Sequence, residues 1–271
     1  MAGTKSRRPT PEIVERWLKA GFGQGVGAFY KPFMYVRDVP SQGTSSMVHS
    51  RLTGRVHHYL SRQEFKVHLH AEYSKNVIDI REQFALLPRD ETLDLAHELG
   101  IKHPKFPTTN TPTILTTDLL LSVNGDAAQE EIAISVKLKK DLTPRALEKL
   151  LIEKTYWNRR GCRWILATED SISSIRVKNL AFFESSLADE RVRESKISPA
   201  YFSACFERHV RPELSFNDIM LLAIREIGID AHTGHSLLGQ AVWNHESLLN
   251  IDDIVLTHRS QVLLHRVNLR V

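Results

Sequence analysis

The sequence has few cysteines, no long hydrophobic run and little excess of either charge. Two cysteines in 271 residues, Cys162 and Cys205, supply neither a disulfide framework nor a zinc knuckle, and we expect both to be reduced. No run approaches the roughly 18 apolar residues of a membrane-spanning helix. The basic N-terminus is not followed by an apolar stretch, so no signal peptide is expected. These absences predict a soluble, cytoplasmic protein with no membrane partner.

The net charge gives little information on what kind of molecule the protein binds. The chain carries 36 Lys and Arg against 32 Asp and Glu, a formal net charge of +4. This mild excess permits a nucleic-acid partner without requiring one. The hydrophobic content of 42% supports a substantial core, and the length suits one large domain or two modest ones.

A glycine-rich tract near the N-terminus does not have the features of a nucleotide site. Residues 21–25 read Gly-Phe-Gly-Gln-Gly, but they follow a predicted helix at residues 11–20. A phosphate-binding loop would need a preceding strand and a Gly-Lys-Ser/Thr ending, and both are missing. We therefore interpret the tract as a loop.

The first 170 residues alternate between helical and strand patterns. Period-2 alternation or apolar runs predict strands at residues 77–84, 116–123, 131–139 and 163–168. Helices are predicted at residues 57–73, 93–99 and 143–160, the last starting with a capping Thr143 and Pro144. This order predicts an α/β fold with a mixed sheet flanked by helices.

The composition changes near residues 168–174, which we interpret as a domain boundary. Residues 1–170 are expected to form one domain and residues 171–271 a second, mostly helical one. Its helices are predicted at residues 175–187, 198–209, 215–228 and 232–243. Two short strands at 254–256 and 262–267 would complete the outline of a winged helix.

Two carboxylates and a lysine are the most informative candidates for chemistry. Glu64 interrupts the apolar stripe of a predicted helix, where an unpaired charge is costly. Asp118 lies near the start of one strand, and Lys137 lies on the strand that returns after the Asn124-Gly125 turn. A hairpin would bring Asp118 near Ser135 and Lys137. Two carboxylates can hold Mg²⁺ for phosphodiester cleavage, but the spacing alone leaves open a helix edge or a buried salt bridge at Glu64.

Several segments around these residues resemble the TnsA family, the restriction-endonuclease-like subunit of a two-part transposase. The resemblance covers about residues 10–168, and the C-terminal third matches only in outline. The resembling segments are residues 54–58, 79–84, 86–88, 100–104, 147–150 and 156–157.

The resemblance implies a nuclease core whose pattern is a helix Glu, a strand Asp, and then Glu or Gln, any residue, Lys. By position, Glu64 and Asp118 become metal ligands and Lys137 the catalytic lysine. Ser135 stands where the family has Gln or Glu. A serine hydroxyl is a poor Mg²⁺ ligand beside a carboxylate, so Ser135 would bind through its side chain or its backbone carbonyl.

The resemblance also implies a function and partners. The expected reaction is Mg²⁺-dependent hydrolysis of the non-transferred strand at the 5′ ends of a transposon, with Mn²⁺ as a substitute. Expected partners are transposon-end DNA, an integrase-like transposase resembling TnsB, and an ATP-dependent regulator resembling TnsC. The regulator would contact the C-terminal domain. Two alternatives stay open: a free-standing restriction or repair nuclease, and a catalytically inactive transposition adaptor.

Other polar residues have two interpretations each. Asp79, Arg81 and Gln83 are as well explained by hydrogen bonding within the sheet as by contact with DNA or metal. For Glu153 we expect a position on the solvated face of its helix, in preference to hydrogen bonding with the metal ligands. For His57, His58, His68 and His70 we expect surface positions or contacts with DNA and not metal binding. Lys139 and Lys140 form a basic cluster with Lys137, and we expect them to contact phosphate.

Overall fold

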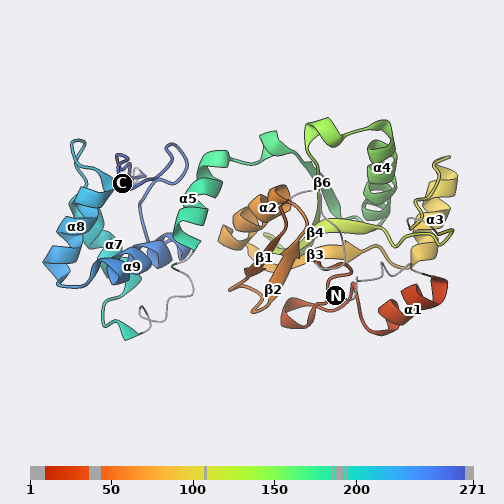
Figure 1. Cartoon of the computed structure of the whole chain (residues 1–271), viewed down its shortest axis with the longest axis horizontal. Coiled ribbons are helices and arrows are strands. Elements are labelled where there is room, and N and C mark those ends of the chain that lie inside the picture. The colour runs from red at the N-terminus through yellow and green to blue at the C-terminus, as the bar shows by residue number, and fades with distance from the viewer. Residues whose placement is uncertain are drawn as a thin grey trace, which may run out of the picture. The chain divides into compact units, whose positions relative to one another are not determined.

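A computed structural model describes residues 10–36, 44–106, 109–184, 186, 192 and 194–265 (Figure 1). The chain divides into two compact units, Met1–Ile172 and Ser173–Val271. The helices of the first unit are α1 (Pro11–Lys19), α2 (Arg62–Tyr73), α3 (Arg89–Glu98) and α4 (Pro144–Arg159), with short 3-10 turns η1 (Gly27–Phe29), η3 (Lys139–Asp141) and η4 (Glu169–Ser171). Its strands are β1 (Ser46–His49), β2 (Val56–Tyr59), β3 (Val77–Ala85), β4 (Thr116–Asn124), β5 (Gln129–Val136) and β6 (Arg163–Ala167).

A four-stranded mixed sheet in the order β3-β4-β5-β6 organises the first unit (Figure 1). Strand β4 pairs antiparallel with both β3 and β5, and β6 pairs parallel with β5. The parallel pair needs a crossover connection, which α4 supplies. Together with the helices of the second unit, this sheet confirms the predicted α/β fold class.

One face of the sheet packs on α3 and α4. Leu120 of β4 and Ala133 of β5 point into this core and are fully buried. Burial of these apolar side chains is the main force that holds the helices on the sheet. The rest of the cluster consists of Leu86, Leu95, Ala96, Ile152, Tyr156 and Trp157.

The predicted helix at residues 57–73 is wrong in its first turn. Residues 56–59 form strand β2, paired with β1, and α2 begins only at Arg62. His57 and Tyr59 are buried while Val56 is exposed, which is the alternation of a strand with one covered face. The helix begins where the Ser61 hydroxyl accepts a hydrogen bond from the backbone N–H of Glu64.

The second unit contains α5 (Ser174–Glu184), α7 (Pro199–Arg208), α8 (Phe216–Ile227) and α9 (Ala231–Trp243). The predicted helices are thus present, but the predicted strand at 254–256 is absent from the described residues. Backbone pairing instead joins Asn250 N–H to Leu263 O and His265 N–H to Leu248 O. Residues 266–267 of the second predicted strand lie outside the described residues.

A buried side chain explains why residues 254–256 are not a strand. The amide of Asn179 on α5 donates to the carbonyl oxygens of Ile251 and Ile254 and accepts from Leu256 N–H. These backbone groups are therefore satisfied by a side chain, and they need no partner strand. The result is an irregular loop held against α5, which a hydropathy pattern cannot distinguish from a short strand.

Within the described part of the chain, no helix combines the length and the hydropathy needed to cross a membrane.

Candidate active site

Glu64 lies in the first turn of α2 and points into the protein. Its side chain is 5% exposed, and Oε2 accepts a hydrogen bond of 3.0 Å from Leu60 N–H. Ser61 fixes the start of the helix by accepting from Glu64 N–H at 3.1 Å. A carboxylate at this position is favoured by the positive end of the helix dipole. The cap therefore determines where the Glu64 carboxylate lies.

Asp118 of β4 faces the end of β5, as the hairpin predicts. Its Oδ2 accepts from Val136 N–H at 2.7 Å and lies 3.5 Å from Lys137 Nζ. Lys137 directly follows the last residue of β5, and its ammonium group also donates to Val136 O at 3.0 Å. The Asp118 carboxylate raises the pKa of Lys137, so this side chain is cationic at neutral pH.

Gln83 joins the two carboxylates. Its Nε2 lies 3.3 Å from Glu64 Oε2 and 3.4 Å from Asp118 Oδ1, and its Oε1 accepts from Thr116. The residue is 1% exposed and has a φ of 46°, in the left-handed region that non-glycine residues seldom adopt. Such strain costs on the order of 1–3 kcal/mol and tends to occur at functional sites. The sequence leaves the role of Gln83 open between hydrogen bonding in the sheet and a role at the site, and the structure places its side chain between Glu64 and Asp118.

Asp79 and Arg81 lie in a separate network, as the sheet interpretation expects. Arg81 pairs with Glu131 at 2.5 Å and with Asp79 at 3.5 Å, and it donates to Ser122. Asp79 accepts from Gly27 N–H at 3.0 Å. Both side chains are therefore committed to contacts within the unit.

Glu153 of α4 is buried behind the hairpin and does not lie on a solvated face, so that interpretation was wrong. Its Oε1 accepts hydrogen bonds from Thr117 at 2.7 Å, from the Ser135 hydroxyl, and from the Trp164 indole at 3.3 Å. Ser135 thus directs its only hydroxyl hydrogen to Glu153. The network could not be predicted from spacing, because it depends on how β5, β6 and α4 pack.

Burial raises the pKa values of two carboxyl groups at the site, those of Glu64 and Glu153. Desolvation, and secondly the charge of Asp118, raise the pKa of Glu64 to about 7. The same two causes raise the pKa of Glu153 to about 7. The carboxyl groups of Glu64, Asp118 and Glu153 are close enough to repel one another when ionised, and Lys137 is the cation beside them.

This donor set fits a divalent cation. Glu64 and Asp118 each place a carboxylate oxygen next to the side-chain nitrogen of Gln83. Oxygen atoms are the ligands that Mg²⁺ prefers. A bound cation would relieve the negative charge that raises the pKa of Glu64. The geometry therefore permits a metal held by two carboxylates with a lysine beside it, an arrangement suited to phosphodiester chemistry.

The predicted surface positions of His57 and His68 are wrong. Both rings are buried, and His57 Nδ1 lies 2.8 Å from Glu82 Oε2, which also pairs with Arg55 at 2.6 Å. Tyr59 joins the two histidines through its hydroxyl. This cluster is structural. Lys139 is exposed and forms an ion pair with Asp170.

Two comparisons relate the chain to known proteins. Residues 74–169 match the family model described as TnsA-like endonuclease N terminal. This range includes Gln83, Asp118, Ser135 and Lys137, and Glu64 lies before it. The chain is 39% identical over 189 residues to the transposon Tn7 transposition protein TnsA of Escherichia coli. That match covers 69% of this chain and 68% of the relative. The chain therefore belongs to the TnsA family of transposition endonucleases.

Proposed function

We propose that this chain is the metal-dependent endonuclease subunit of a cut-and-paste transposase, which hydrolyses the non-transferred strand at the 5′ ends of the transposon. The observation that supports this most is the convergence of Glu64, Asp118 and Lys137 from α2, β4 and the end of β5. Family membership supports an endonuclease acting in transposition. The choice of strand is the part that we add.

The proposed cofactor is Mg²⁺, for which Mn²⁺ would substitute. Glu64 and Asp118 would hold the ion through their carboxylates. Ser135 is left out of the proposed ligand set, because its hydroxyl donates to Glu153. Its carbonyl oxygen points away from Asp118, since the N–H of the same trans peptide unit, that of Val136, donates to Asp118. When bound, such an ion lowers the pKa of a bound water and offsets charge on the phosphoryl oxygens.

In the proposed hydrolysis, a water oxygen forms a bond to phosphorus while the bond from phosphorus to the leaving sugar oxygen breaks. The attacking water gives up a proton to solvent, and the leaving oxygen takes up a proton from solvent. Because its pKa is raised by Asp118, Lys137 stays protonated and does not act as the base. It would instead donate hydrogen bonds to the scissile phosphate or the attacking water, where negative charge develops. Gln83 would hold Glu64 and Asp118 at a fixed separation through its amide N–H.

We further propose two protein partners. An integrase-like transposase resembling TnsB would cut and join the 3′ ends, and an ATP-dependent regulator resembling TnsC would contact the unit Ser173–Val271. The mild net charge of +4 is consistent with a subunit that takes its DNA specificity from a partner, because phosphate contacts by Lys and Arg supply most non-specific affinity.

Strand mapping on end-labelled transposon-end DNA tests the function. The protein is incubated with Mg²⁺, with and without the partner transposase. Breaks at the 5′ ends that need both proteins support the proposal. Equal cleavage without the transposase would instead support a free-standing nuclease. Intact 5′ ends beside normal 3′ cleavage would support an inactive adaptor.

A further inference from the structure

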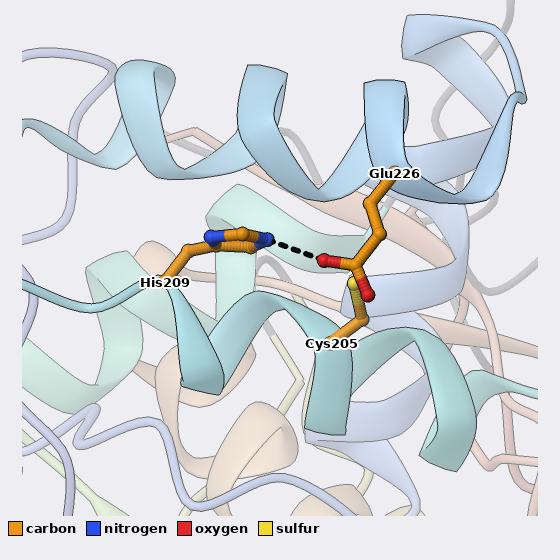
Figure 2. A group of neighbouring side chains, drawn as sticks. All are labelled: Cys205, His209 and Glu226. Atoms are coloured by element: carbon orange, nitrogen blue, oxygen red, sulfur yellow. Dashed lines mark hydrogen bonds and ion pairs between the residues drawn. The ribbon is translucent and has the colours of Figure 1, made fainter.

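Three metal-ligating side chains meet between two helices of the second unit (Figure 2). Cys205 lies on α7, and His209 is the residue that caps this helix at its C-terminal end. Glu226 projects from the facing helix α8. One ligand atom from each side chain lies within 4.8 Å of the other two. His209 Nε2 and Glu226 Oε2 are already 2.7 Å apart.

The spacing explains why these side chains converge. Residues four apart on a helix lie on the same face, so Cys205 and His209 present their donors side by side. Helix α8 packs against α7 through apolar residues of both helices, among them Phe206 and Phe216, whose rings are 5.5 Å apart. This packing brings Glu226 opposite the pair. The three donors therefore sit on a rigid framework and not on a loop.

From this geometry we propose that Cys205, His209 and Glu226 form a binding site for a thiophilic divalent transition metal, with Zn²⁺ as the expected ion. Thiolate, imidazole and carboxylate are all established Zn²⁺ ligands, and three protein ligands leave a fourth position for water. A thiolate and an imidazole select against Mg²⁺, which prefers oxygen. The site is therefore distinct in chemistry from the candidate nuclease site.

The metal-free arrangement is consistent with such a site. Cys205 is fully buried beside Glu226. Glu226 is shared between His209 and Arg208. Metal binding would replace the thiol proton, which leaves to solvent, and His209 would bind as neutral imidazole. Arg208 is 55% exposed at its side chain, so it can release Glu226 into the metal site and return to water.

Two of the three side chains of the cluster are partly exposed to solvent. The side chains of His209 and Glu226 are 27% and 42% exposed, while the sulfur lies on the inner side. A bound ion would cross-link α7 to α8. Since the metal binds the folded unit and a preformed site is absent from the unfolded chain, it would stabilise this unit.

Cobalt substitution of the full chain, prepared without an affinity tag, tests the proposal. Co²⁺ bound to a thiolate gives a sulfur-to-metal charge-transfer absorption that carboxylate sites cannot produce. We expect this absorption in the wild type, its loss on adding Zn²⁺, and its absence in Cys205→Ser. The matched control is Cys162→Ser, which removes the other cysteine of the chain and should leave the absorption unchanged.

Variants of the charged residues separate a metal site from a surface ion-pair network. Glu226→Gln and His209→Ala should weaken Zn²⁺ affinity by more than the roughly 10- to 100-fold typical of losing an outer-shell partner. Arg208→Ala should retain or raise the affinity, because it frees the Glu226 carboxylate. Circular dichroism without metal verifies that each variant is folded. The proposal is overturned if wild type shows no charge transfer at saturating Co²⁺, if Cys205→Ser keeps it, or if Arg208→Ala loses metal as Glu226→Gln does.

Discussion

The side-chain amide of Gln83 lies 3.4 Å from the carboxylate of Asp118, and the same nitrogen lies 3.3 Å from Glu64. Gln83 thereby connects the helix carboxylate to the strand carboxylate in the absence of metal. It does so from a backbone with a positive φ, which the pairing of β3 with β4 must hold in place. We expect this residue to set the separation of the two proposed ligands.

Replacing Gln83 with Leu should lower the cleavage rate and the Mg²⁺ affinity together, by about 10- to 100-fold. A loss of this size is usual for residues that hydrogen-bond to metal ligands. Leucine keeps the size of the side chain and the backbone strain but removes the N–H between Glu64 and Asp118. Calorimetric Mg²⁺ titration and the strand-mapping assay measure the two effects. Thr116→Val, which removes only the bond to Gln83 Oε1, should have a smaller effect. Unchanged Mg²⁺ affinity in Gln83→Leu would contradict the positioning role.

Lys137→Ala should abolish most cleavage and spare metal binding. In the proposed mechanism the ammonium group donates to the scissile phosphate or the attacking water, and losing one such donor typically costs about 10²–10³-fold in rate. The carboxylates of Glu64 and Asp118 remain, so Mg²⁺ should still bind. Single-turnover cleavage rates and calorimetry separate the two effects. A loss of metal affinity equal to that of a ligand variant would show that the role assigned to Lys137 is wrong.

Ser135→Ala should reduce stability more than metal affinity. The hydroxyl is one of three donors to the buried Glu153, and leaving a buried acceptor short of a partner costs about 1–3 kcal/mol. The proposed ligands Glu64 and Asp118 are retained. Urea unfolding and Mg²⁺ titration on the same variant measure the two quantities. A variant with full stability and lost Mg²⁺ affinity would indicate that the side chain itself binds the metal.

The buried pair of Arg55 and Glu82 should make folding sensitive to acid. Burial by itself would raise the pKa of Glu82, but hydrogen bonds and charge from His57 and Arg55 outweigh it and lower the pKa to about 2, from 4.5. The folded state thus binds fewer protons than the unfolded state between these values. This stabilisation is complete above pH 4.5 and is lost as the pH falls toward 2.

Glu82→Gln should cost about 3–5 kcal/mol near neutral pH, because it leaves the buried Arg55 without its counter-charge. It should also reduce the loss of stability between about pH 4.5 and pH 2. Unfolding curves across this range provide the measurement. Glu91→Gln is the control, since its pair with Arg160 is more exposed and should be worth about 0–1 kcal/mol. Identical pH profiles for Glu82→Gln and the wild type would rule out this assignment.

Local patterns were sufficient to predict the sheet and the meeting of Asp118 with Lys137. Both follow from period-2 alternation and a strong turn at Asn124-Gly125, which fix the hairpin within one stretch of chain. Glu64 was identifiable because a carboxylate in an apolar helical stripe breaks the pattern. The helix starts later than the pattern predicts, because Ser61 caps it. The alternating residues before the cap form strand β2 and not the first turn of the helix.

The remaining contacts depend on packing between distant segments. The position of Gln83 results from an unusual φ inside a strand, which no composition rule predicts. Glu153 receives its donors from β4, β5 and β6, so its burial requires the whole sheet and α4. Similarly, the four-residue spacing of Cys205 and His209 is visible in the sequence, but Glu226 joins them only through the packing of α7 on α8.

The measurement that tests the central claim most directly is strand mapping of Asp118→Ala beside the wild type, with Mg²⁺ and the partner transposase. We predict that the 5′-end break disappears in Asp118→Ala while 3′ cleavage and the fold remain. Asp126→Ala, in the turn after β4, is the matched control and should cleave normally. An undiminished 5′-end break in Asp118→Ala would contradict the proposed site.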